Sequence, residues 1–212
     1  MTQTITQVPE NANVVNCLLE GTFVATPDGE TKVEVIRIGE LVRTADGRDV
    51  PVTWIGRQTI LKAFAGEKAE MVKIAAGALG NHSDLYVTRD HGMIVDGYVI
   101  NASALVNGHS INWVPLSDTA DRFTVYHIET EAHDIILANG APSETYLDIP
   151  GRQAFDNYAE YLALYGEERA IPEMRQPRIT TQRLLPQEVR DRLWIGAVMC
   201  GDDAFAVMTL SA

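Results

Sequence analysis

Short apolar or β-branched runs separated by Asp-Gly turns are the feature that most constrains how this chain can fold. Asp-Gly pairs occur at residues 28–29, 46–47 and 96–97, each next to a run of that kind. The strongest signal lies in residues 93–100, because apolar residues flank the Asp-Gly pair and glycine accepts the positive φ of a type I′ turn. A series of short strands and tight turns predicts an all-β body over residues 17–148, a barrel or sandwich variant.

Four further runs are predicted as strands from their β-branched composition or alternation. These runs are residues 31–36, 51–55, 124–131 and 134–138. The preceding residues 1–16 show no such periodicity and are expected to form a polar lead-in.

The composition changes in residues 149–212, which are expected to form a mostly helical extension. Helical spacing of apolar residues predicts one helix over residues 155–165, and a proline in the first turn predicts another over residues 186–194. Residues 167–182 between them are expected to be a linker, since they hold Glu, Arg and two prolines. The predicted apolar faces comprise Phe155, Tyr158, Ala159, Leu162 and Tyr165, ended by Gly166, and Val189, Leu193 and Trp194.

The bulk composition argues against several classes of function. A net charge of −12 and a pI of about 4.8 disfavour nucleic acid, which is bound by clustered Lys and Arg, and disfavour an anionic membrane surface. The first residues resemble no secretory signal peptide, and no apolar run is long enough for a transmembrane segment. A cytoplasmic location, or export by a signal-independent route, is expected. The only disulfide that two cysteines allow is Cys17–Cys200.

Cys17 is the leading candidate for a reactive group. It stands just before a strand-like stretch that ends in a turn. A thiolate is a strong nucleophile that is accessible near neutral pH, and the nearest acyl group is the peptide bond preceding Cys17 itself. The downstream groups that could join it in one site are Thr88, His91, His127 and His133.

Three blocks of residues follow one another in a recognisable order. The blocks are Cys17 to Gly29 with Val33 to Val42, then Thr88-Arg89-Asp90-His91-Gly92, then Val125 to Glu129 with His133 to Gly140. Together they resemble the Hint (hedgehog/intein) domain, most closely its bacterial intein-like type. The resemblance covers residues 17–140 and implies a horseshoe-shaped, pseudo-two-fold all-β fold, here followed by a C-terminal α-helical extension.

The resemblance implies autoprocessing of the chain's own N-terminal flanking segment, residues 1–16. By this resemblance the Cys17 thiol attacks the Asn16 carbonyl in an N-to-S acyl shift, which converts the peptide bond to a thioester. His91 is the implied proton donor to the leaving nitrogen, since an imidazole has a pKa near neutrality. Thr88 would hydrogen-bond and polarise the scissile peptide.

The remaining site residues follow from the same blocks. Asp90 is expected to orient its loop, and His133 belongs to the late block. His127 departs from many inteins, which carry an acidic residue there; it either shuttles protons or marks reduced activity. Neither a cofactor nor a metal is implied, because Cys17 and the five histidines lack the tight spacing of zinc ligands.

The chain also departs from the splicing pattern after Gly140. Splicing inteins end in an asparagine, usually after a histidine, and no His-Asn pair follows here. Full splicing is therefore not expected, and the thioester would be resolved by water, a thiol or an amine. Two alternatives remain open: a catalytically inactive Hint-fold structural or interaction module, and a cysteine hydrolase acting on other proteins.

Overall fold

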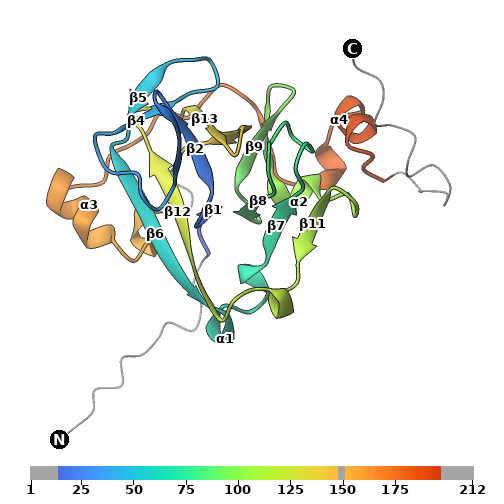
Figure 1. Cartoon of the computed structure of the whole chain (residues 1–212), viewed down its shortest axis with the longest axis horizontal. Helices are drawn as coiled ribbons and strands as arrows, with labels where there is room; N and C mark the ends of the chain where they lie inside the picture. The colour runs from blue at the N-terminus through green and yellow to red at the C-terminus, as the bar shows by residue number, and fades with distance from the viewer. Residues whose placement is uncertain (1–13, 148–150, 197–212) are drawn as a thin grey trace, which may run out of the picture.

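The computed structural model describes residues 14–147 and 151–196, which form mainly β-sheet (Figure 1). The six-stranded sheet has the order β11 (Ile111–Val114), β7 (Met71–Ile74), β8 (Leu85–Thr88), β1 (Leu18–Leu19), β12 (Arg122–Glu129), β6 (Trp54–Leu61). The seven-stranded sheet has the order β15 (Arg178–Ile179), β10 (Tyr98–Asn101), β9 (Gly92–Val95), β14 (Ala141–Glu144), β13 (Ile135–Ala138), β2 (Phe23–Thr26), β3 (Gly29–Lys32). A separate hairpin pairs β4 (Leu41–Arg43) with β5 (Asp49–Pro51).

All the helices in the described residues are short. The α-helices are α1 (Lys62–Ala65), α2 (Ala102–Leu105), α3 (Tyr158–Tyr165) and α4 (Gln187–Arg192). The 3₁₀ turns are η1 (Gly66–Ala69), η2 (Leu116–Asp118), η3 (Arg152–Ala154) and η4 (Gln182–Leu184). None of the helices within the described ranges has the length and apolar character needed to cross a membrane.

The strand predictions succeed where a tight turn fixes them. Residues 93–100 form the β9–β10 hairpin, with Asp96 and Gly97 at φ 50° and 80° as a type I′ turn requires. The prediction over residues 31–36 is wrong beyond Lys32, because the chain leaves β3 there and turns.

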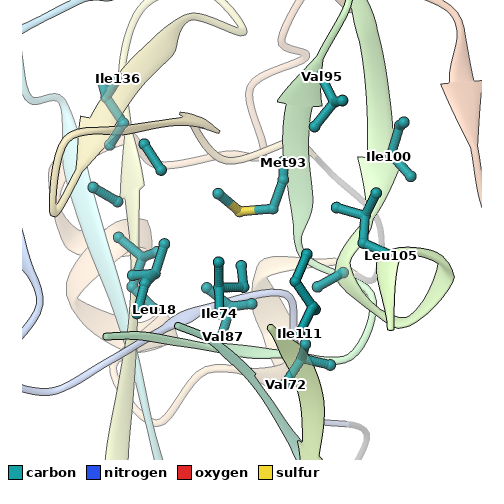
Figure 2. Packing of buried hydrophobic residues seen from close by; sticks show 14 of the residues in the cluster. Leu18, Val72, Ile74, Val87, Met93, Val95, Ile100, Leu105, Ile111 and Ile136 are labelled. Carbon is teal, nitrogen blue, oxygen red and sulfur yellow. The ribbon is translucent and has the colours of Figure 1, made fainter. Parts of the chain in front are cut away.

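A buried hydrophobic cluster lies between the two large sheets. Leu18 from β1, Ile74 from β7 and Met93 from β9 are each at most 1% exposed. In Figure 2 the Met93 side chain points into the middle of the cluster, between Leu18 and Ile136 on one side and Ile100 and Leu105 on the other. This contact joins the two sheets and fixes their relative position.

The first C-terminal helix packs on β6 through its preceding turn. The Asn157 side chain accepts a hydrogen bond from the Arg57 N–H at 2.9 Å and donates one to the Ile55 carbonyl at 2.9 Å. Gly166 ends α3 with φ 76°, as predicted. The predicted apolar face is partly wrong: Tyr161 is fully buried, whereas Leu162 is 36% exposed, because the turn at Asn157 orients the helix.

The predicted linker over residues 167–182 contains a strand. β15 pairs in parallel with β10 at the edge of the seven-stranded sheet, with Ile179 opposite Ile100. A two-residue strand after a proline has no periodicity of its own, so only pairing with β10 defines it. The second predicted apolar face is correct for Val189 and Leu193 and wrong for Trp194, which is 43% exposed and adopts a φ of 57°.

Candidate active site

Cys17 lies at the start of β1 between two neighbouring strands. β1 pairs with β8 through Leu18 and Val87, and with β12 through Leu18 and Tyr126, both antiparallel. One step further along these registers, Cys17 faces Thr88 on one side and His127 on the other. The sheet therefore brings together three candidate residues that are up to 110 positions apart in the sequence.

Thr88 hydrogen-bonds both the backbone N–H and the backbone carbonyl of Cys17. The Cys17 N–H donates to Thr88 Oγ1 at 2.7 Å, and the Thr88 N–H donates to the Cys17 carbonyl at 3.0 Å. Both residues are at most 1% exposed, so these bonds form away from water. The nitrogen that would leave in an acyl shift is thus fixed and polarised by a threonine hydroxyl.

His91 lies in the turn after β8, beside the peptide that precedes Cys17. Its backbone N–H donates to the Thr88 carbonyl at 3.1 Å, and its ring Nε2 shares a 2.6 Å hydrogen bond with Ser143 Oγ of β14. Burial lowers the pKa of His91 to about 4, against the opposing effects of the Glu144 carboxylate and the nearby Asn16 backbone. The imidazole is therefore neutral at pH values where a histidine of ordinary pKa would be partly charged.

The second ring nitrogen of His91, Nδ1, is the one that does not contact Ser143. Nδ1 is buried and makes no hydrogen bond of full geometry with any described residue. The neutral imidazole thus lies beside the Asn16 backbone, which acts on the pKa of the ring.

His127 stands against His91 in the same buried space. The two ring centroids are 5.2 Å apart, and His127 meets the Tyr146 ring edge-on at 5.5 Å. Burial, with the neighbouring His91, lowers the pKa of His127 to about 3. Its Nε2 makes no hydrogen bond of full geometry in the described part of the chain, and the two neutral imidazoles lie side by side.

His133 reaches this centre through Glu144. The Met174 N–H donates to His133 Nδ1 at 3.3 Å, which places the proton of a neutral ring on Nε2. Nε2 then donates to Glu144 Oε2 at 3.1 Å, and the Gly92 N–H donates to Glu144 Oε1 at 2.6 Å. Burial would raise the pKa of Glu144, but the hydrogen bonds from His133 and Arg178 and the charge of Arg178 lower it well below its usual range.

Arg178 brings the C-terminal extension into this network. Its guanidinium donates to both carboxylate oxygens of Glu144, and Nη1 also donates to Asn101 Oδ1 at 3.2 Å. Asn101 in turn donates to Asp90 Oδ1 at 3.2 Å. Asp90 itself is exposed, so it supports the loop through Asn101 at the edge of the site.

The sequence motifs therefore located part of the site. Thr88, His91 and His127 lie around Cys17. His133 and Asp90 are connected to this group through Glu144 and Asn101, respectively. Ser143, Glu144 and Arg178 were missed, because none of them belongs to one of the three sequence blocks. His82 and His109, which match no block, are exposed.

Two other expectations concern cysteine and metal. Cys17 has a free thiol, and Cys200 lies outside the described residues. Burial raises the pKa of Cys17 well above its usual value, so the resting group is a thiol that needs a base. Among residues 14–147 and 151–196, no group of three or more His, Cys, Asp or Glu is arranged to hold a metal ion.

Three solved structures are similar to this chain. A bacterial intein-like domain from Clostridium thermocellum is 13% identical, with a TM-score of 0.49 over 63% of this chain and 100% of that one. The MchDnaB-1 intein (N145AA) is 14% identical, with a TM-score of 0.46 over 61% and 99% of the two chains. The gp41-1 intein is 16% identical, with a TM-score of 0.45 over 61% and 98%. No curated protein matches the sequence.

A family model supplies the assignment. The model described as the Hint domain matches residues 16–150, which include every residue placed around Cys17 except Arg178 and Met174. The fold is the mostly β Hint fold, with short helices near the C-terminus. The chain belongs to the Hint domain family.

Proposed function

We propose that this protein processes its own chain by an N-to-S acyl shift at the Asn16–Cys17 peptide bond. Cys17 Sγ bonds to the Asn16 carbonyl carbon, the bond from that carbon to the Cys17 nitrogen breaks, and the thiol proton ends on the nitrogen. One observation carries the proposal: Thr88 holds the Cys17 nitrogen at 2.7 Å, while a buried neutral imidazole lies beside the Asn16 backbone.

The proton transfer follows from the pKa shifts of Cys17 and His91. Burial raises the pKa of the thiol and lowers that of the imidazole to about 4, so both groups start neutral. The His91 imidazole accepts the thiol proton as sulfur attacks, and the imidazolium then donates it to the departing nitrogen. The ordered backbone makes the attack intramolecular, which removes the entropic cost of bringing two reactants together.

The thioester is then resolved by an outside acceptor. Residues 140–147, after the late block, contain no asparagine that could cyclise. Water, a thiol or an amine adds to the Asn16 carbonyl, the C–S bond breaks, and the sulfur leaves as the Cys17 thiol. Each chain reacts once, so the protein is a single-turnover autoprocessing domain.

Mass spectrometry of a tagged full chain tests the proposal. A tag is placed ahead of Met1, and the purified protein is incubated with and without dithiothreitol at neutral pH. We expect release of a fragment ending at Asn16, faster with the thiol, and no release from Cys17→Ala. Cys200→Ala is the matched cysteine control and should react like the parent chain. A parent chain that stays intact under both conditions would refute the proposal.

The alternative function is a catalytically silent Hint-fold interaction module. The fully buried Cys17 thiol, with its raised pKa, favours that alternative, since burial of a cysteine also occurs without reactivity. The same assay separates the two. The third possibility, hydrolysis of other proteins, is disfavoured because Val15 and Asn16 of the chain itself lie beside the candidate catalytic residues.

A further inference from the structure

The residue two positions before Cys17 is inserted into the protein rather than lying on its surface. Val15 is 1% exposed and belongs to a buried cluster with Cys17 and Trp54. Two members of this cluster, Phe155 and Tyr161, come from the C-terminal extension. A segment that the proposed reaction would release is thus built into the core.

The backbone of Val15 is held as well as its side chain. The Val15 N–H donates to Gln58 Oε1 at 3.3 Å, and Gln58 Nε2 donates to the Ala154 carbonyl of η3 at 3.1 Å. Gln58 is thereby oriented by the extension while it binds the backbone of Val15. Side-chain burial with one backbone hydrogen bond is how extended peptides are recognised at specific positions.

Phe155 and Tyr161 of the extension form a closely packed apolar wall of this cluster. Phe155 packs directly on the backbone of β6: a Cβ added at Gly56 would lie 2.5 Å from the Phe155 ring. Trp54 meets Phe155 and Tyr161 edge-on, with ring centroids 5.2 Å and 5.3 Å apart. A closely packed apolar wall discriminates between side chains by size, since a larger side chain overpacks it and a smaller one leaves a void.

We propose that residues 152–161 form, with Gln58, an acyl-side subsite that selects a small β-branched apolar residue at position 15. The proposal rests on the proposed acyl shift and names its upstream sequence requirement. Valine fits because it is a compact apolar residue whose side chain is almost completely buried in the cluster. A charged residue is rejected because it would be buried without a partner.

Variants at position 15 test the selection in the tagged full chain. Val15→Ala and Val15→Leu should each slow fragment release by about tenfold or more, which corresponds to a modest loss of positioning. Val14→Leu is the matched control one residue upstream, at a half-buried position, and should remain within about threefold of the parent by the same rate relation. The rescue is the decisive measurement: Phe155→Leu enlarges the wall and should restore the rate of Val15→Leu, but not that of Val15→Ala. Equal rates for all position-15 variants, or no rescue in a double variant that folds, would overturn the proposal.

A measurement without cleavage separates this proposal from the proposed reaction. In the Cys17→Ala chain, amide hydrogen exchange reports directly on the Val15 N–H. We expect that amide to be protected from exchange, and Gln58→Leu to remove the protection. Urea unfolding of the same variant checks that it still folds. If the parent chain does not cleave but Val15 shows this behaviour, the proposed reaction fails and the subsite remains. An unprotected Val15 amide in the Cys17→Ala chain would reject the subsite.

Discussion

Replacement of Arg178 by methionine should destabilise the protein far more than loss of a surface ion pair. Arg178 donates to both oxygens of Glu144, whose side chain is 1% exposed, whereas its own is 19% exposed. Removing one partner of a buried pair leaves an uncompensated charge, which typically costs about 3–5 kcal/mol. His133 and the Gly92 N–H still bind Glu144, so we expect the free energy of unfolding to fall by about 2–4 kcal/mol.

Urea unfolding of full-length chains carrying Cys17→Ala measures this loss without interference from cleavage. Arg192→Met is the matched control, because Arg192 also belongs to the extension and pairs with Asp96 at 2.9 Å, with both side chains exposed (51% and 42%). An exposed pair contributes about 0–1 kcal/mol, so this variant should change stability little. Arg178→Lys, which keeps the charge but not the two-pronged geometry, should fall between them.

The double variant Arg178→Met/Glu144→Gln checks the cause. With the carboxylate neutralised, the double variant should lose less stability than the sum of the two single variants. Arg178 also lowers the pKa of His91, so an NMR titration of Arg178→Met should find that pKa raised. If Arg178→Met is no less stable than Arg192→Met, or if the two single losses simply add, the assignment of a coupled buried network is wrong.

Two further predictions concern the same centre. Gly92→Ala should lower the unfolding free energy by about 1–3 kcal/mol in urea unfolding, because the new Cβ would lie 2.6 Å from Glu144 Cδ and 2.5 Å from Val99 Cγ1; an unchanged midpoint would contradict the packing. The stability of the Cys17→Ala chain should fall as pH drops from about 6.5 to about 4, because the unfolded chain binds a proton at His91 in that window and the folded chain does not. For a shift of this size the loss attributable to His91 is roughly 3 kcal/mol, and a His91→Gln variant should show a flatter pH dependence of the urea midpoint.

Local sequence signals predicted the strands that carry their own turns. The β9–β10 hairpin was predictable because Asp96-Gly97 specifies one turn geometry, and the flanking apolar residues specify which strand faces are buried. The predicted strand over residues 51–55 illustrates the limit: β5 ends at Pro51 and β6 begins at Trp54, because the two segments pair with different partners. Local composition contains no information on that change of partner.

The candidate site was predicted to the same degree. The order of the three blocks located Thr88 and His91 beside Cys17, because each block has its own short motif. Glu144 has no motif and Arg178 fell within an expected linker, so neither was found. Their pairing depends on β15 joining β10, a contact between residues 79 positions apart.

The sequence alone determined the mostly β character, the family and the identity of the candidate nucleophile, since these follow from turn chemistry and motif order along the chain. Only the tertiary structure decided the protonation states and the contacts of the extension. Burial lowers the pKa of His91 to about 4 and raises that of Cys17, and the extension supplies Arg178 to Glu144 and Phe155 to the cluster around Val15. Desolvation and ion pairing depend on what surrounds a group in space, and that surrounding is assembled from segments that are distant in the sequence.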